Sequence, residues 1–343
     1  MTKQRSWTRG TTVAWSTALC FSDPLSFQAA ISTADLELLP TARGHFRAEL
    51  TKVCMNQLWV QRCYQNLPLM IAGAMKPRRR VFTFLTSAEP EAMRHCGMDI
   101  VSGDIIVNTF DEIHQQTEAE FRLGSISLTT DDFDAVCNAI VGHEFPGDKL
   151  KLVVRPNPEL MSRLTELHRT VGQIAKTTPA IVELPQVSRA LEQQLVHLIV
   201  RCVTEGAPLK IPLGASRHDT IVARFEAFLE ANPNTPLYLP EICAAIGAAE
   251  RTLRAACEEH LGMGPIRYLT LRRMHLVRRA LLRADGSTTV TRIATDHGFW
   301  ELGRFSVAYR TLFGETPSDS LRRPSDNPRV LLNRPSSLAD NFA

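Results

Sequence analysis

The sequence lacks the features that mark several large protein classes. None of its apolar runs approaches the roughly 18–20 consecutive residues of a membrane span, so no such span is expected. The motifs G-x-S-x-G and H-E-x-x-H are absent, and so is a glycine-rich phosphate loop. These absences argue against an enzyme.

Cysteine pairs with metal-ligand spacing are also missing. There is no C-x-x-C pair and no short spacing from cysteine to histidine, which argues against a zinc site or a disulfide framework. Reduced and mostly buried thiols in a cytoplasm are expected instead. The eight cysteines are scattered over the whole sequence: Cys20, Cys54, Cys63, Cys96, Cys137, Cys202, Cys243 and Cys257.

The first residues resemble a signal peptide only superficially. Lys3, Arg5 and Arg9 precede the mixed stretch "TTVAWSTALC", but threonines and a serine interrupt it and no A-x-A site follows. We therefore expect a cytoplasmic protein. Its 343 residues, 44% hydrophobic and 22% charged, fit two soluble globular domains. The formal net charge of +3 is too small to indicate nucleic-acid binding by itself.

The first two thirds of the chain are β-rich. From residue 25 to about 155, short runs such as "AELTKVCM", "VFTFL" and "FRLGSISLT" alternate with glycines, prolines and acidic turns. This pattern predicts antiparallel strands in a barrel or sandwich. Apolar residues at three- and four-residue steps then predict helices over 159–175 and 187–203.

The last third differs in composition and pattern. Residues 219–323 contain no lysine, and their apolar spacing is helical throughout. The predicted fold class is therefore α+β with two domains, a β-barrel or jelly-roll-like domain followed by two helices, and an all-α domain. The predicted segments are an extension (1–24), a sensor and dimerisation domain (25–203), a linker (204–218), a DNA-binding domain (219–323) and a disordered tail (324–343).

Two similar helical units occur in the last third. In the second, a helix at 289–296, a turn at Gly298 and a helix at 301–312 follow one another, as in a helix-turn-helix. At 100° per residue, the second helix turns one side inward, comprising Leu302, Phe305, Ala308, Tyr309 and Leu312. The opposite side comprises Trp300, Gly303, Arg304, Val307 and Arg310. Phe299 and Phe313 are also assigned to the core, whereas Trp300 suits either packing or DNA contact.

The first unit has the same plan. Pro240 begins a short helix, Gly247 turns the chain, and the next helix is predicted to bury Leu253, Ala256 and Cys257. Its outward side carries Arg251, Thr252 and Ala255, with Arg254 at the edge. Between the units, 265–284 predicts an amphipathic helix roughly 30 Å long. Successive major grooves lie about 34 Å apart, so such a helix suits two reading helices one turn apart. Its apolar positions are Ile266, Leu269, Met274, Leu276, Val277, Leu281 and Leu282.

Arginine is concentrated in the same region. From Arg251 to Arg323 there are 13 arginines and seven acidic residues, a balance of 13 − 7 = +6. A local arginine excess on a helical domain is typical of phosphate binding. The arginines of the connecting helix suit a solvated face, structural ion pairs or DNA contact: Arg272, Arg273, Arg278 and Arg279.

Residues 235–323 resemble the DNA-binding domain of the AraC/XylS family of bacterial transcription regulators. The stretches "ERTLR…HLGMGPIRYL" and "IATDHGF…RFSVAYRTLFGETPSD" carry the resemblance. It implies double-stranded DNA and RNA polymerase as partners. Ala249 stands where a capping serine is usual, and Cys257 stands where a phenylalanine usually fills the core. The residues expected to contact DNA are Arg251, Thr252, Arg254, Ala255, Trp300, Gly303, Arg304, Ser306, Val307 and Arg310.

The amino-terminal half resembles a cupin-like sensor barrel through "VSGDIIVNTFDEIHQQ". No H-x-H pair occurs, His114 stands alone and His143 is distant, so neither a metal nor another cofactor is expected. His114 is interpreted as a satisfied barrel residue. An apolar lumen for a small-molecule effector is expected, and the two following helices resemble a dimerisation element, so a homodimer is expected.

The predicted function is therefore an effector-responsive, sequence-specific transcription activator. The alternative is a ligand-independent DNA-binding or architectural protein whose amino-terminal domain only dimerises.

Overall fold

The structure is a computed structural model that describes residues 14–31, 33–87, 92–108, 112–142, 152–209, 213–232, 237–284, 288–322 and 329–330. Residues 1–13 of the predicted extension, His143, and the predicted tail except for Arg329 and Val330 lie outside the described residues.

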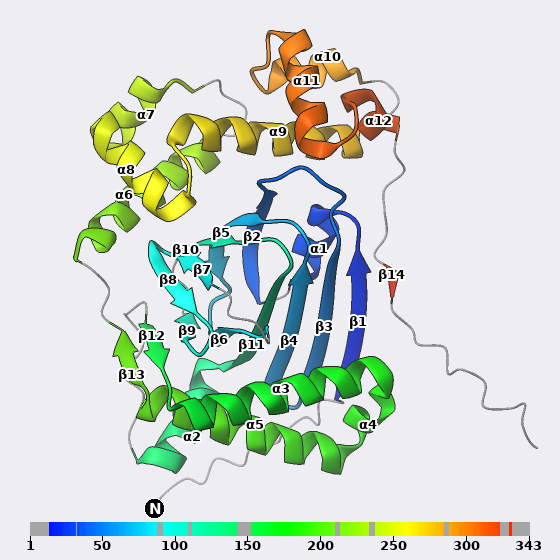
Figure 1. Ribbon diagram of the computed structural model, residues 1–343, viewed down its shortest axis with the longest axis vertical. Helices are drawn as coiled ribbons and strands as arrows, with labels where there is room; N and C mark the ends of the chain where they lie inside the picture. Colours follow the sequence, from blue (N-terminus) through cyan, green and yellow to red (C-terminus); the bar gives the residue numbers. More distant parts are fainter. Residues whose placement is uncertain are drawn as a thin grey trace, which may run out of the picture.

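The amino-terminal half contains two antiparallel sheets (Figure 1). The larger has the order β13-β12-β9-β6-β11-β4-β3-β1-β14. Its strands are β1 (Trp15–Phe21), β3 (Ala48–Met55), β4 (Leu58–Gln65), β6 (Arg79–Leu85), β9 (Ile105–Asn108), β11 (Phe121–Thr129), β12 (Leu152–Arg155), β13 (Ala207–Leu209) and β14 (Arg329–Val330). The smaller has the order β2-β5-β10-β7-β8, formed by β2 (Ala34–Pro40), β5 (Leu69–Met75), β10 (Glu112–Thr117), β7 (Ala92–His95) and β8 (Met98–Val101).

Alternating side chains build the core of this half. Phe82 and Phe84 of the larger sheet pack with Leu164 and Ile199, and all four are fully buried. Leu164 and Ile199 belong to two helices that run across the larger sheet. These helices lie where the apolar spacing of the sequence predicts helices. The helices of this half are α1 (Pro24–Ala30), α2 (Thr130–Val141), α3 (Pro158–Thr177), α4 (Pro179–Glu183) and α5 (Pro185–Glu205).

The carboxy-terminal half is helical, as predicted. Its elements are α6 (Leu213–Ala231), α7 (Leu239–Ile246), α8 (Glu250–Leu261), α9 (Pro265–Arg283), α10 (Val290–Asp296), α11 (Leu302–Phe313) and α12 (Pro317–Arg322). Figure 1 shows α6–α8 at one end of α9 and α10–α12 at the other. Each end has its own apolar cluster, and α9 contributes to both. None of the helices in the described ranges has the length and apolar character needed to cross a membrane.

The boundaries differ from the sequence expectation in two places. β1 lies inside the predicted extension, because it pairs along its whole length with β3 and buries Ala18 and Phe21. The predicted linker contains the end of α5, strand β13 and the start of α6. Pro208 suggested a linker, but β13 is an edge strand, where proline is tolerated.

Two side-chain assignments were wrong. Ile266 was placed on the apolar side of α9, yet it is 56% exposed, because the first turn of α9 packs through Pro265 and Tyr268 and turns Ile266 away from the core. Ala308 was placed on the inward side of α11 and is exposed, since the larger aromatic side chains on either side of it fill the contact.

Candidate nucleic-acid interface

Helix α11 is anchored by aromatic side chains. Phe305 and Tyr309 are buried, and the Tyr309 hydroxyl donates a 2.7 Å hydrogen bond to Ser320 Oγ. The ring centroids of Phe299 and Phe305 lie 4.9 Å apart, and those of Tyr309 and Phe313 lie 4.5 Å apart. The predicted aromatic core is thus confirmed. Gly314 ends the helix with φ +73°, a conformation that glycine adopts without strain.

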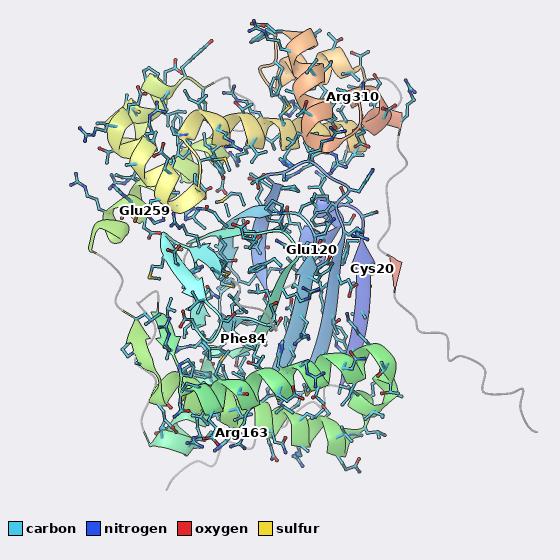
Figure 2. All side chains as sticks on the ribbon, viewed as in Figure 1. Cys20, Phe84, Glu120, Arg163, Glu259 and Arg310 are labelled. Atoms are coloured by element: carbon cyan, nitrogen blue, oxygen red, sulfur yellow. The ribbon has the colours of Figure 1, made fainter. Side chains whose placement is uncertain are left out.

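The opposite side of α11 faces solvent. Gly303, Arg304, Ser306, Val307 and Arg310 are all exposed, with Arg310 labelled in Figure 2. Val307 is 69% exposed, so its apolar side chain is accessible for contact with another molecule.

Two larger side chains extend this face at the beginning of α11. Trp300 is 70% exposed, so the packed interpretation of this residue is wrong. Among the described residues, the guanidinium of Arg304 pairs with the exposed Glu301 carboxylate, at 2.9 Å, and such a pair is weak in water. Arg304 is therefore available to another partner.

Helix α8 presents a smaller exposed surface. Arg251, Arg254 and Ala255 are exposed and Thr252 is half-buried. The Arg254 guanidinium donates to the exposed Glu250 carboxylate at 2.9 Å. On the opposite side, Leu253, Ala256 and Cys257 are fully buried, as predicted.

The first turns of both helices lack side-chain caps. Ala249 and Glu301 occupy the N-cap positions of α8 and α11, and neither accepts a capping hydrogen bond. By contrast, Thr289 caps α10. Uncapped backbone N–H groups at a helix N-terminus, together with the helix dipole, form a site for a phosphate oxygen.

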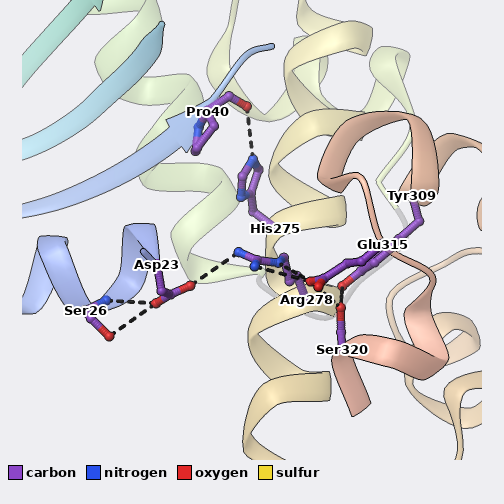
Figure 3. Close-up of polar contacts among 8 residues, drawn as sticks. All are labelled: Asp23, Ser26, Pro40, His275, Arg278, Tyr309, Glu315 and Ser320. Atoms are coloured by element: carbon purple, nitrogen blue, oxygen red, sulfur yellow. Dashed lines mark hydrogen bonds and ion pairs between the residues drawn. The ribbon is translucent and has the colours of Figure 1, made fainter. Parts of the chain in front are cut away.

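Three arginines of α9 contact the amino-terminal half. Arg272 and Arg279 pair with Glu37 at 3.0 and 3.3 Å. Arg278 pairs with Asp23 and Glu315, each at 3.3 Å (Figure 3). Structural ion pairing is thus the interpretation that these contacts support. Six of the 13 arginines in the local charge count have acidic partners among the described residues, and three of these six lie on α9.

His114 joins the two halves of the molecule. Its ring is fully buried, and Nε2 lies 2.6 Å from the Glu226 carboxylate of α6. The Tyr268 hydroxyl donates to the same carboxylate at 2.5 Å. Burial lowers the pKa of His114, but the Cys96 and Glu226 side chains outweigh it and raise that pKa to about 10. The partner of this barrel histidine is therefore a residue of the helical half.

The interior of the barrel contains a small cavity of about 70 Å³. Phe27, Leu38 and Phe121 contribute apolar surface, and Gln61 and Gln115 contribute amides. Pockets for drug-sized ligands enclose about 300–1,000 Å³, so this cavity suits only a very small molecule unless its walls move.

Two other histidines, His168 and His275, are buried and have lowered pKa values. We therefore expect the protein to lose stability in mild acid. Burial lowers the pKa of His168 to about 3, with a further lowering by Arg62. Burial also lowers the pKa of His275 to about 3. The hydrogen bond to the Pro40 carbonyl raises this pKa in part, and the charge of Arg278 lowers it further. An unfolded histidine titrates near pH 6.5, so the unfolded state binds more protons between about pH 6.5 and 3.

The stability from these histidines is therefore present above about pH 6.5 and lost as pH falls. The free energy of unfolding from urea denaturation is expected to drop by about 2 kcal/mol between pH 6.5 and 5.5. A His168→Asn variant, which keeps an acceptor for Arg62, is expected to lose about half of this dependence. An identical pH dependence in variant and parent would contradict the assignment.

Sequence patterns did not identify the contacts between the halves. Asp23, Glu37 and Glu226 have no local signature, and their partners Arg278, Arg272 and His114 are separated from them by 255, 235 and 112 residues. Helical periodicity shows which residues share a face but not which distant strand covers that face.

The helical half of the chain is similar in sequence to known proteins. Residues 242–323 match a helix-turn-helix domain family. The XylDLEGF operon transcriptional activator 2 of Pseudomonas putida is 32% identical over 120 residues, which cover 35% of this chain and 75% of that protein. An activator 1 of the same operon and organism is 35% identical over 220 residues, 64% of each chain.

A further relative is the probable thc operon regulatory protein of Rhodococcus erythropolis. It is 40% identical over 96 residues, which cover 28% of this chain and 29% of that protein. The match to this protein, and the match to activator 1, thus span less than two thirds of the relative's length.

Proposed function

The chain belongs to the AraC/XylS family of transcription regulators, and on this basis we propose that it is a sequence-specific, effector-responsive activator. Members of this family are DNA-binding transcription factors and not enzymes. The observation that carries the proposal is the pair α8 and α11. Each buries one side in its own apolar cluster and exposes an arginine-bearing side.

In the proposed complex, α8 and α11 enter consecutive major grooves on one face of the DNA. Helix α9 has 19 residues and is therefore about 28 Å long, which is comparable with the distance of about 34 Å between grooves. The proposed contact residues are Arg251, Thr252, Arg254 and Ala255 of the first unit and Trp300, Gly303, Arg304, Ser306, Val307 and Arg310 of the second.

We propose that the contacts with DNA are of two kinds, contacts with base edges and contacts with phosphates. Arg251 and Arg304 lie near the beginning of their helices, where side chains reach base edges, and arginine suits bidentate bonding to guanine. Arg310 lies in the last turn of α11 and is assigned to a phosphate. The uncapped first turns of both helices add phosphate contacts that fix the position of the protein without reading sequence.

The amino-terminal half is proposed to sense a small effector and to form a homodimer in the cytoplasm. Relatives of this chain are named operon activators, which supports RNA polymerase as a partner. The proposed domain boundaries are those predicted from the sequence, except that β1 and β13 join the sensor domain and the whole of α6 joins the DNA-binding domain. An effector shifts the equilibrium only if it binds one arrangement of the domains more tightly than the other.

The cavity volume favours a second candidate function. A cavity of about 70 Å³ suits a domain that dimerises without a ligand. The protein would then bind DNA independently of any effector.

Selection of genomic DNA fragments by the purified protein tests the proposed function. We expect enrichment of sites that contain two short motifs about one helical turn apart, because two reading helices face adjacent grooves. Sequencing of the bound fragments measures this. Enrichment of a single motif would contradict the paired-helix arrangement. If no site is enriched by the full chain, the same selection with residues 206–343 distinguishes effector-dependent binding from the absence of specific binding.

A further inference from the structure

Four side chains with metal-binding chemistry meet where the two halves of the molecule touch. Cys96 lies between β7 and β8, His114 lies on β10, Asp219 on α6 and His260 on α8. One ligand atom each of Cys96, His114 and Asp219 lie within 4.8 Å of one another. His260 Nδ1 lies 3.9 Å from an Asp219 carboxylate oxygen.

The two histidines of this cluster are buried and incompletely satisfied. Both rings are fully buried. Among the described residues, His114 Nδ1 and both ring nitrogens of His260 have no hydrogen-bond partner. Buried polar atoms in native proteins are normally paired with protein, water or an ion. Each ring thus has at least one nitrogen without a hydrogen-bond partner in the described part of the chain, which indicates a ligand that accepts an electron pair from each ring.

The backbone of the β7–β8 turn holds the cluster together. Cys96 has φ +48° and Gly97 has φ +79°, and this tight turn brings Cys96 toward α8. A Cβ at Gly97 would lie only 3.1 Å from His260 Nε2 and 3.2 Å from a Glu259 carboxylate oxygen. The turn and α8 are thus in close contact, and glycine leaves room for the His260 ring.

We propose that Cys96, His114, Asp219 and His260 bind one zinc ion between the two domains. A thiolate, two imidazoles and a carboxylate form a four-ligand set that suits zinc better than magnesium or calcium. In a tetrahedral zinc site the ligand atoms lie about 3.3–3.6 Å apart. The ligand atoms of Cys96, His114 and Asp219 lie within 4.8 Å of one another, so shifts of about 1 Å bring these three to the ion, and the His260 ring turns to complete the site. This proposal differs from the expectation, based on the sequence, that no metal is bound. That expectation rested on the absence of closely spaced ligands, whereas the four proposed ligands come from four separate segments of the chain.

The surroundings of His114 match those of a metal-bound histidine. Glu226 accepts a hydrogen bond from Nε2, which leaves Nδ1 as the nitrogen for the metal. The Tyr268 hydroxyl in turn holds the Glu226 carboxylate. Such a carboxylate–histidine pair orients the ring and strengthens it as a ligand.

Zinc at this position fixes α6 and α8 against the amino-terminal sheets, because each domain supplies two ligands. Since α8 is a proposed reading helix, zinc would hold the first helix-turn-helix unit in one orientation relative to the sensor domain. This regulatory consequence rests on the proposed function, whereas metal binding itself does not.

Titration of the full chain with cobalt tests the site, after a chelator has removed bound metal. We expect one equivalent of cobalt with the absorption of a tetrahedral ion and a sulfur-to-cobalt charge-transfer band, and displacement by one equivalent of zinc. Cys96→Ser is expected to abolish the charge-transfer band. His260→Gln and Asp219→Asn are expected to weaken affinity at least 10- to 100-fold, since even outer partners of a metal ligand contribute that much.

Matched controls are Cys20→Ser and His197→Gln, which change the same residue types outside the cluster and are expected to bind cobalt like the parent chain. Circular dichroism of each metal-free variant confirms its fold, and three separate ligand substitutions keep the test valid if one variant does not fold. Cobalt binding without a sulfur band, or equal affinity in the ligand variants and the controls, would overturn the proposal. Neither readout depends on DNA, so failure here is distinguishable from failure of the proposed function.

Discussion

Replacement of Arg251 and Arg304 together by alanine is expected to abolish specific DNA binding and to leave the fold intact. Both side chains are exposed, one on each proposed reading helix. A bidentate arginine–guanine contact contributes about 1–3 kcal/mol, so loss of two weakens binding by about 2–6 kcal/mol, or roughly 30-fold to more than 10⁴-fold. Fluorescence anisotropy with a fragment recovered by the selection measures the affinity, and thermal unfolding verifies the fold.

The matched control is the double variant Arg163→Ala and Arg189→Ala. It removes the same two positive charges from exposed positions on α3 and α5, which lie across the sheets from α8 and α11 (Figures 1 and 2). If the control weakens binding as much as the reading-face variant, general charge rather than base contact carries the affinity. An unchanged affinity in the reading-face variant would remove the assignment of both helices.

The salt dependence distinguishes base contacts from phosphate contacts at the same positions. Each phosphate contact that is lost reduces the slope of log K against log salt concentration by about 0.9. Arg310→Ala is assigned to a phosphate and should reduce the slope, with a similar loss of affinity for all sequences. Arg304→Ala should instead change the preferred base at one position of the motif.

The helices of the DNA-binding half were predictable because their packing is local. Phe305 and Tyr309 lie four residues apart and therefore face the same side of α11 without reference to any other element. The same reasoning located the buried side of α8. It was wrong for Ala308, where the periodicity predicted a face but the size of the neighbouring aromatic residues determined which side chains made contact.

The contacts between the halves were not predictable, because their partners lie far apart in the sequence. Glu37 on β2 meets Arg272 on α9 only after both domains have folded, and no periodic pattern relates the two positions. The same holds for Cys96 and His260, whose approach depends on a tight turn and a buried helix end. Spacing rules identify metal ligands that lie within one short motif, whereas the four proposed zinc ligands belong to four separate segments.

Replacement of Arg278 by methionine is expected to lower the free energy of unfolding by about 3–5 kcal/mol, the usual cost of breaking a buried ion pair. The Arg278 side chain is only 11% exposed and contacts carboxylates on both halves of the molecule. Its guanidinium also lies 5.1 Å from the Phe313 ring centroid. Methionine retains much of the apolar contact but removes the cation that pairs with the Asp23 and Glu315 carboxylates (Figure 3). Urea denaturation measures the loss.

Arg283→Met is the matched control, because Arg283 lies on the same helix and is exposed, and it should change stability by less than about 0.5 kcal/mol. Addition of Asp23→Asn and Glu315→Gln to the Arg278→Met variant removes the uncompensated charges and should restore most of the stability. Asparagine also caps α1 as aspartate does, so helix capping does not confound this rescue. A triple variant no more stable than Arg278→Met alone would mean that the guanidinium stabilises the interface through packing rather than through charge.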